Sequence, residues 1–338
     1  MQAVVWTDFG KIAVQDVPAP VPGREEVLVR VKAATLCKTD VNMIEHGILG
    51  IDPPVIIGHE VAGLVVAAGP AVQGLAVGQL VALDPPVPCR RCPVCLAGLP
   101  HMCPHTRHIG AHTPGGMAEY IAIDYRNAYA VPAGVSPLAA SLAEPFASSL
   151  EALERAGGVA GRTIVIAGDG PFGIIMCRLA ARAGARQVLL FGHHAERMAL
   201  ATPYGVLAFD GRAVDTGRCI AEHTAGLGAD ALIDTTASPQ VMSGAIGWLA
   251  PRGTLVVYAL PEQPIALDLA TVHFKEIQVH GACRSLAMFP AALQALAADG
   301  TAAEALISRT LPIADVAYGF SLITDHKADV VKVAVVFD

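Results

Sequence analysis

An apolar run leads into a glycine loop at Thr163-Ile164-Val165-Ile166-Ala167-Gly168-Asp169-Gly170-Pro171-Phe172-Gly173, and this stretch gives the strongest indication of the fold. β-Branched residues in the first half favour a strand, and the second half fits the pattern G-x-G-x-x-G. In that pattern Gly168 permits a tight turn, Gly170 lets the backbone approach a pyrophosphate, and Gly173 allows a helix to pack closely on the strand. The other loop positions that we expect beside the pyrophosphate are Pro171 and Phe172. The stretch therefore predicts a dinucleotide site at the start of a helix.

The residues that follow extend this unit into a larger sheet. A helical pattern covers residues 174–183, and strand-like apolar runs occur at 187–191, 231–234 and 254–258. Strands that alternate with helices indicate a parallel, doubly wound sheet with helices on both faces. We therefore predict an α/β fold with a Rossmann-type dinucleotide-binding domain over residues 148–280.

The end of the second predicted strand lacks an expected carboxylate. Sites for NAD usually carry Asp or Glu about 20 residues after the glycine loop, where it binds the adenosine ribose. Here the strand ends in Gly192, and no acidic residue occurs between Pro171 and Ala195. Basic residues follow at His193, His194 and Arg197. A small residue beside basic groups suits the 2′-phosphate of NADP, which we predict as the preferred cofactor; the alternative is an NAD site whose ribose contacts come from elsewhere.

The rest of the chain differs in its composition and in its pattern of apolar residues. With 338 residues the chain is long enough for about two domains. Residues 1–147 are rich in Pro and Gly, with short strand-like runs at 27–31 and 63–67 and turns such as 21–24, which indicates an irregular all-β body. From residue 281 the pattern is mixed again and ends in a strand at 330–337. We predict that 281–338 returns to the first domain.

Half of the eight cysteines lie close together, at Cys89, Cys92, Cys95 and Cys103. Their spacing is C-x2-C-x2-C-x7-C, and two-residue gaps let a tight loop point successive thiolates at one centre. Four thiolates complete a tetrahedral Zn²⁺ shell with no open position, which is typical of a structural zinc site. Four unrelated buried cysteines, or an iron–sulfur cluster, are the alternatives. The gap of seven residues and the absence of another redox cysteine motif favour zinc.

Further motifs show a family resemblance. They are Cys37-Lys38-Thr39-Asp40, Gly58-His59-Glu60-Val61-Ala62-Gly63 and Gly115-Gly116-Met117-Ala118-Glu119-Tyr120. With the four cysteines and the glycine loop in the same order, the chain resembles the zinc-containing medium-chain alcohol dehydrogenase family over essentially its whole length. Glu144-Pro145 stands where other members carry a third ligand cysteine, so the chain is similar to the sorbitol and threonine dehydrogenase branch. The resemblance implies a GroES-like first domain and an NAD(P)-dependent zinc enzyme acting on CH–OH groups.

The resemblance also implies a catalytic zinc site. Its ligands would be Cys37, His59 and one carboxylate, from either Glu60 or Glu144. One thiolate, one neutral imidazole and one carboxylate balance the charge of Zn²⁺ and leave a coordination position open for substrate. Asp40 is expected to orient the His59 ring. Together with the four-cysteine site, this predicts two zinc ions per chain.

The roles implied for other residues concern the proton and the cofactor. In relatives the substrate proton leaves through a hydroxyl, here Thr39, and a hydride passes to the nicotinamide. Many relatives carry a histidine five residues after the first ligand cysteine, but this chain has Asn42; His46 could replace it, or it is a solvated loop residue. Lys38 resembles a residue that contacts the cofactor phosphates, the alternative being an ordinary surface lysine. Arg284 resembles an arginine near the metal pocket, the alternative being an interface ion pair.

The expected metal pocket is polar. It would be lined by Glu45, His46, Glu60, Glu144 and Arg284. Such a wall suits a polyol, sugar, aminocyclitol or aminoglycoside-like substrate with a secondary hydroxyl, and a threonine-like amino alcohol is the alternative. A zinc-free quinone or enoyl reductase of the same fold is disfavoured, because those relatives lack both metal sites.

Composition narrows the partners. The formal net charge is −7, the chain is 53% hydrophobic, and no run of about 18 apolar residues or signal-like start occurs. We therefore expect a cytoplasmic protein with a small-molecule substrate and with neither nucleic acid nor membrane as partner. The resemblance suggests a homodimer or homotetramer. Two alternative functions are a zinc module that binds nucleic acid and a catalytically idle relative that senses a nucleotide or the redox state.

Overall fold

The chain forms two compact units. The structure, a computed structural model, describes residues 1–285, 287–325 and 327–338. The first unit comprises Met1–Ala147 and Leu286–Asp338, and the second comprises Ser148–Ser285. Helix α4 (Ala143–Arg155) begins in the first and ends in the second.

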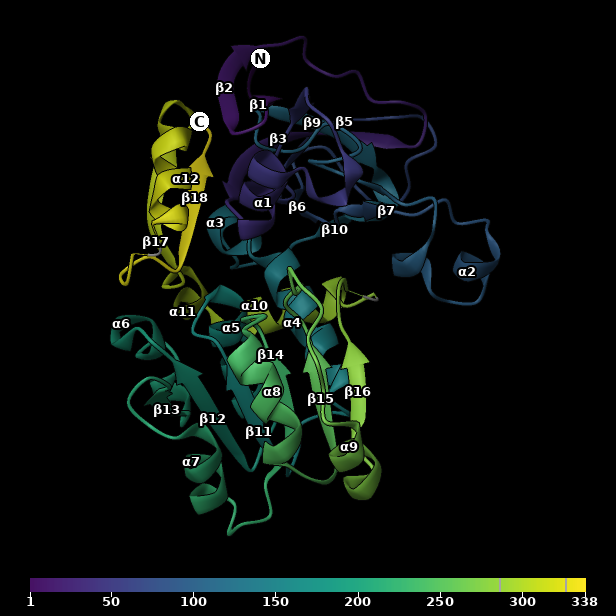
Figure 1. The fold of residues 1–338 in the computed structure, drawn as a ribbon. Coiled ribbons are helices and arrows are strands. Elements are labelled where there is room, and N and C mark those ends of the chain that lie inside the picture. Colours follow the sequence, from purple (N-terminus) through teal and green to yellow (C-terminus); the bar gives the residue numbers. More distant parts are fainter. Residues whose placement is uncertain (286, 326) are drawn as a thin grey trace. The chain divides into compact units, whose positions relative to one another are not determined.

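The second unit is built on a six-stranded sheet with the strand order β13-β12-β11-β14-β15-β16, in which all neighbours are parallel. The strands are β11 (Thr163–Ala167), β12 (Gln187–Gly192), β13 (Leu207–Asp210), β14 (Ala229–Asp234), β15 (Leu249–Val257) and β16 (Gln278–Gly281). They lie side by side in Figure 1, where α8 (Pro239–Trp248) passes in front of them. The chain moves from β11 to one edge and then returns to β14 beside β11. This order confirms the predicted doubly wound sheet, and ligands bind at such a reversal point.

The helices of the second unit follow from local sequence. Besides α4 and α8 they are α5 (Pro171–Arg182), α6 (Ala195–Met198), η4 (Thr202–Tyr204), α7 (Thr216–His223) and α9 (Leu269–Lys275). Helix α5 begins earlier than the predicted 174, because Pro171 occupies its first position, where a fixed φ and a missing N–H cost nothing. Central strand residues such as Val165, Leu189 and Leu232 are fully buried. Each such side chain stabilises the fold by roughly 1.5–3 kcal/mol.

The first unit is mainly β, as predicted. Its larger sheet runs β10-β6-β5-β3-β18-β17, with β9 also paired to β3, and smaller sheets join β2-β1-β4 and β7-β8. The strands are β1 (Gln2–Asp8), β2 (Lys11–Asp16), β3 (Glu26–Thr35), β4 (Val55–Ile56), β5 (Glu60–Ala68), β6 (Leu80–Leu83), β7 (Pro86–Val87), β8 (Arg107–His108), β9 (Tyr120–Asp124), β10 (Ala128–Ala130), β17 (Ile307–Pro312) and β18 (Lys332–Val336). Apolar side chains such as Trp6, Val29 and Met117 fill its core.

Short helices complete the first unit: α1 (Lys38–His46), η1 (Ile48–Gly50), α2 (Pro93–Leu96), η2 (Pro100–Met102), η3 (Tyr125–Asn127), α3 (Pro137–Ala140), α10 (Phe289–Asp299), α11 (Thr301–Glu304), η5 (Ile313–Asp315) and α12 (Val316–Thr324). In the part of the chain that the structure describes, no helix has both the length and the apolar character needed to cross a bilayer. Figure 1 shows α2 in a loop that extends away from the sheets of its own unit.

Three strand ends meet at one place in the first unit. Thr35, the last residue of β3, pairs with Glu60, the first residue of β5, and with Ala334 of β18. The turn into α1, the start of β5 and the start of β18 therefore converge. This convergence positions the candidate metal site.

Candidate active site and metal centres

The first candidate metal group consists of Cys37, His59 and Glu60. One ligand atom from each lies within 4.8 Å of the others. All three are buried, with exposed fractions of 4%, 6% and 0%. Cys37 directly precedes α1, and His59 directly precedes β5. The pairing of β3 with β5 therefore brings together residues that are more than twenty positions apart.

Asp40, in the first turn of α1, holds both neighbouring ligands. Nδ1 of His59 lies 3.0 Å from Oδ1 of Asp40, and the backbone N–H of Cys37 donates to Oδ2 over 3.3 Å. Burial alone lowers the pKa of His59, but the charge and hydrogen bond of Asp40, with a smaller effect of Cys37, raise it well above its ordinary value. The bond to Nδ1 leaves Nε2 as the nitrogen that faces a metal.

Glu60 is held by a lysine that the sequence analysis missed. Both carboxylate oxygens accept from Nζ of Lys332, and Oε2 also accepts from the hydroxyl of Thr35. Nζ of Lys332 donates further to the carbonyl of Leu36 over 3.2 Å. Burial alone lowers the pKa of Lys332, but the negative charge of Glu60 raises it overall, so the lysine stays charged. The one available signal was a single charged residue inside an otherwise apolar strand.

Glu144 lies outside this three-residue group, but the charges of Glu60 and His59 affect its pKa. It lies in the first turn of α4. Burial, and then the negative charge of Glu60, raise the pKa of Glu144 to about 7. At neutral pH a large fraction of this side chain therefore carries a proton. Of the two carboxylates that the sequence left open, Glu60 is the one that the structure places with Cys37 and His59.

The donor set of this group fits a zinc ion. A thiolate, an imidazole nitrogen and a carboxylate oxygen are its usual protein ligands. One thiolate and one carboxylate balance a charge of 2+. Three protein ligands leave a fourth position, as in catalytic rather than structural zinc sites.

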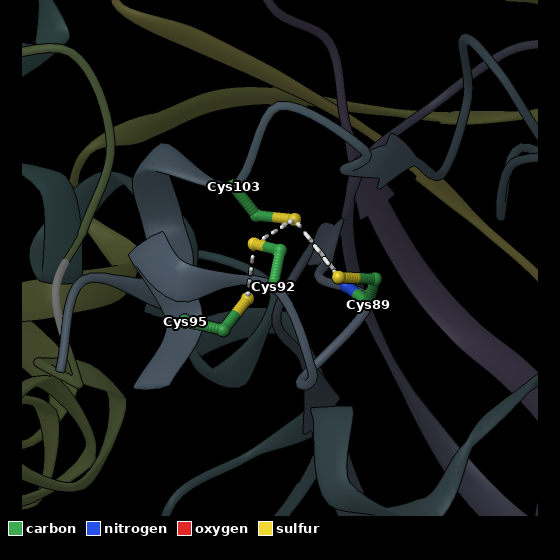
Figure 2. Close-up of side chains that lie close together, drawn as sticks. All are labelled: Cys89, Cys92, Cys95 and Cys103. Carbon is green, nitrogen blue, oxygen red and sulfur yellow. Dashed lines mark hydrogen bonds between the residues drawn. The ribbon is translucent and has the colours of Figure 1, made fainter. Parts of the chain in front are cut away.

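The four cysteines form the second candidate metal group. Figure 2 shows their sulfurs turned toward one another. The Sγ atoms of Cys92 and Cys95 are 3.5 Å apart, those of Cys103 and Cys89 3.5 Å, and those of Cys92 and Cys103 3.7 Å. Disulfides need about 2.05 Å, whereas a tetrahedron of thiolates around Zn²⁺ at about 2.3 Å has edges of about 3.8 Å. The arrangement therefore fits a closed zinc shell.

The cysteine loop is tied to the first unit through Asn127. The guanidinium of Arg90, between the first two cysteines, donates to Oδ1 of Asn127 over 2.7 Å. The amide nitrogen of Asn127 donates to the carbonyls of Asp84 and Pro86, each over 2.8 Å. Asn127 is buried, so each polar atom of its side chain needs a partner. This network anchors the loop to the strands on which it is mounted.

The glycine loop has the shape that a pyrophosphate site requires. Gly168 has φ +110°, and a Cβ there would meet Oγ1 of Thr235 at 2.3 Å. A Cβ on Gly173 would lie 1.9 Å from the carbonyl oxygen of Gly168, so only glycine permits this helix–strand packing. A Cβ on Gly170 would meet nothing within 4 Å, which leaves open space before the N-terminus of α5. The residues present therefore fit the phosphates of a dinucleotide.

A carboxylate does lie at the end of β12, although the strand itself carries none. Oδ2 of Asp169, from the glycine loop, accepts hydrogen bonds from the backbone N–H groups of His193 and His194, each over 2.6 Å. The ring of His194 lies 3.1 Å from the same oxygen, and Arg197 lies 3.9 Å from Oδ1. Asp169 precedes Pro171 and therefore lies outside the segment in which the sequence pattern places a ribose-binding acid. The preference for NADP remains a prediction. It was based on the absence of an acidic residue at the end of β12, whereas in the folded chain Asp169 lies there.

The other predicted residues are more scattered. Lys38 and Thr39 lie exposed on the first turn of α1, next to Cys37. His46 ends that helix with 64% of its side chain exposed, 3.6 Å from Glu45. Seven residues of helix separate Thr39 from His46 by about 10 Å, too far for a direct hydrogen bond. Arg284 belongs to the second unit, and its predicted role beside the metal stays a prediction.

One further residue near the metal group was also missed. The ring of His108, at the end of β8, lies 5.5 Å from the ring of His59 in an edge-to-face arrangement. Its Nδ1 lies 2.9 Å from the carbonyl oxygen of Ile109. No local pattern in the sequence distinguishes His108 from the neighbouring histidines, because only the fold brings it beside His59.

Comparison with known proteins places this geometry in a family. Residues 23–133 match the family model described as alcohol dehydrogenase GroES-like domain, and residues 171–298 match the model described as zinc-binding dehydrogenase. L-threonine 3-dehydrogenase of Bacillus subtilis is 32% identical over 288 residues, covering 83% of this chain and 82% of the relative. The chain belongs to the zinc-binding medium-chain alcohol dehydrogenase family. It is an oxidoreductase that acts on CH–OH groups with a nicotinamide dinucleotide.

Solved structures agree with this membership. A zinc-binding dehydrogenase of Sinorhizobium meliloti, solved with NADP, is 31% identical with a TM-score of 0.92, and the match covers 99% of each chain. Galactitol-1-phosphate dehydrogenase of Escherichia coli is 25% identical with a TM-score of 0.90 over the whole of both chains. The similarity spans the cysteine loop, the metal group and the glycine loop.

Proposed function

We propose that this chain interconverts a secondary alcohol and a ketone of a polar substrate, such as a polyol, sugar, aminocyclitol or aminoglycoside-like compound, with two zinc ions per chain. The observation that carries the proposal is the buried group of Cys37, His59 and Glu60, with its ligand atoms within 4.8 Å of one another. The first unit would serve as the catalytic domain and the second as the dinucleotide-binding domain.

The roles of the ligand residues follow from their contacts. Cys37, His59 and one of the carboxylates Glu60 or Glu144 would hold a catalytic zinc ion, and Cys89, Cys92, Cys95 and Cys103 a structural one. When bound, the catalytic ion would supply a Lewis acid for the substrate oxygen, and the nicotinamide would supply the hydride acceptor. Asp40 fixes the ring of His59, so that Nε2 keeps one direction during turnover.

The neighbours of the metal group would position its ligands and move the proton of the substrate hydroxyl. Lys332 holds the carboxylate of Glu60 in place from the side of β18. Burial and the negative charge of Glu60 raise the pKa of Glu144, so Glu144 would be able to exchange a proton with a polar substrate group when it does not bind the metal. Thr39, exposed beside Cys37, would take the proton outward. His46 would receive it only through water, given its distance along α1.

Lys38 and the glycine loop would hold the cofactor. We assign pyrophosphate contacts to Gly168, Gly170, Pro171, Phe172 and Gly173, and contacts near the adenosine ribose to Gly192, His193, His194 and Arg197. Arg284 would bind a hydroxyl group of the substrate. The assembly that we expect is a homodimer or homotetramer, which light scattering after gel filtration would measure.

A second candidate is a threonine-like amino alcohol. The curated relatives that match this chain at 31–32% identity include L-threonine 3-dehydrogenases of Bacillus and Pyrococcus. Glu144 in its ionised form would also suit an ammonium group on the substrate, whereas both oxygens of Glu60 already accept from Lys332.

The test is a substrate screen with the zinc-loaded protein. Polyols, sugars, aminocyclitols and L-threonine are offered with NAD and with NADP, and reduced nicotinamide is followed by absorbance. We expect turnover of at least one class, lost by more than 1000-fold in Cys37→Ser but retained in Cys219→Ser, whose cysteine lies outside both metal groups. A wild-type protein that holds two zinc ions and binds a dinucleotide, yet turns over no polar alcohol, contradicts the proposal.

A further inference from the structure

The carboxylate of Asp169 occupies the space that a side chain on Gly192 would fill. A Cβ built on Gly192 would lie 2.6 Å from Cβ and 2.7 Å from Oδ2 of Asp169. Gly192 is the last residue of β12, where NAD-binding proteins of this fold usually carry their ribose-binding acid. The acidic group therefore reaches this place from the loop between β11 and α5 instead of from the strand.

This carboxylate is held firmly. Asp169 is 7% exposed, and the backbone N–H groups of His193 and His194 both donate to its Oδ2. Burial alone raises the pKa of Asp169, but these two hydrogen bonds, with that of the His194 ring, lower it below its ordinary value. The side chain is therefore ionised at neutral pH and cannot turn away without leaving two backbone donors unpaired.

The same donors would otherwise suit a 2′-phosphate. Backbone N–H groups and basic side chains at the end of this strand are what a phosphate there would use. Both N–H groups already donate to Asp169, and His194 and Arg197 face its two oxygens. A 2′-phosphate would have to lie against a fixed negative charge, whereas a ribose hydroxyl can donate a hydrogen bond to it.

We propose that Asp169 is the specificity-determining residue of the cofactor site and makes this chain bind NAD in preference to NADP. The inference rests on the proposed dinucleotide function and reverses the preference that β12 alone predicts. It concerns the second unit only, so it is independent of the metal sites.

The test measures the dissociation constants of NADH and NADPH by fluorescence titration of the full-length protein, without a turnover assay. Wild type should bind NADH at least tenfold more tightly than NADPH. Asp169→Asn keeps the size of the side chain and an oxygen that accepts from both N–H groups, but removes the charge. We expect the NADH/NADPH preference to fall by tenfold or more in this variant, mainly because NADPH binds more tightly.

A matched control is Asp210→Asn. Asp210 ends the neighbouring strand β13, with its Oδ1 3.6 Å from the ring of His193 and 3.2 Å from Arg212. Asp210 is the register partner of Gly192 on β13, but the three atoms that a Cβ on Gly192 would meet first all belong to Asp169. We expect its replacement to change the preference less than threefold.

A second variant returns the acid to the strand. In the double variant Asp169→Gly/Gly192→Asp the carboxylate lies at the end of β12 but comes from the strand. This variant should prefer NADH, as wild type does. Gly192→Asp alone should lower the thermal midpoint, since two side chains would share a space that holds one.

The inference is overturned if wild type prefers NADPH or if Asp169→Asn leaves the preference unchanged. It is also overturned if Asp169→Asn weakens NADPH binding, which would mean that Asp169 organises His194 and Arg197 for a phosphate. A wild-type protein that binds neither nucleotide contradicts the proposed function instead.

Discussion

Lys332 is a single buried charge on which the stability of the first unit should depend. Its ammonium group and the carboxylate of Glu60 are both almost completely buried and paired with each other. Removing one partner of such a pair leaves an uncompensated charge in a low-dielectric environment.

We therefore expect Lys332→Met to lower the free energy of unfolding of the metal-free protein by about 3–5 kcal/mol. Urea denaturation measures this change. Lys11→Met removes a surface lysine from an exposed pair with Asp8 and should change the free energy of unfolding far less. The double variant Glu60→Gln/Lys332→Met should recover part of the loss; an additive loss would contradict the pairing.

We expect Asp84 to make the stability of the first unit depend on pH. Its Oδ1 is buried and accepts no hydrogen bond within the described residues. Burial, and then the negative charge of Glu144, raise the pKa of Asp84 from 3.8 to about 8. The folded protein therefore keeps a proton that the unfolded chain releases between these values, so this contribution to stability is lost as the pH rises from about 4 to 8.

The expected consequence is a flatter pH profile for Asp84→Asn. Relative to wild type, this variant should gain stability as the pH is raised from 5 to 8, because it has no carboxyl group to ionise. Urea denaturation at three pH values measures the slope. Asp8→Asn, at an exposed position, serves as control; parallel profiles for wild type and Asp84→Asn would refute the assignment.

At the level of single elements, we expect the order of the cysteine loop to depend on a bound metal ion. The loop contains only the short helices α2 and η2, and several of its apolar side chains, such as Leu96 and Met102, are exposed. Such a segment buries too little apolar surface to hold its shape alone. Bound metal and the Arg90–Asn127 contact would supply most of the missing free energy.

On the proposed assignment of two zinc ions, Cys95→Ser should reduce the zinc content to one ion per chain and lower the free energy of unfolding by several kcal/mol. Elemental analysis and urea denaturation measure the two effects. Cys37→Ser should lose the other ion and leave the loop resistant to proteolysis. Equal proteolysis of the two variants would show that the loop does not depend on its metal.

At the scale of the whole molecule, the two units differ in how the chain builds them. The second is one continuous segment, Ser148–Ser285, whereas the first needs both ends of the chain. Strand β18 pairs with β3 and β17 and supplies Lys332 to Glu60. Without it, β3 loses a neighbour and Glu60 loses its counter-charge.

Residues 148–285 expressed alone should therefore fold cooperatively and bind NADH, while residues 1–147 alone should not. Circular dichroism with thermal unfolding and fluorescence titration would measure this difference. Adding residues 286–338 as a separate peptide should restore structure to the 1–147 fragment. Cooperative unfolding of that fragment by itself would contradict the argument.

Features that depend on short spacings could be predicted from the sequence alone. The glycine loop at 168–173, the four cysteines at 89–103 and the alternation of strands and helices after residue 163 were all predicted, because neighbours along the chain constrain one another through backbone geometry. The doubly wound order followed from the same alternation. The family resemblance added Cys37, His59 and the two glutamates.

Which distant residues meet depends on how the chain packs. The fold pairs Lys332 with Glu60 across 272 positions of sequence, places His108 beside His59, and brings Asp169 to the end of β12. These contacts depend on strand register and on the space that a glycine leaves. Both are properties of the packed chain, because side chains from separate segments of the sequence can fill the same space. A short sequence pattern therefore cannot predict these contacts.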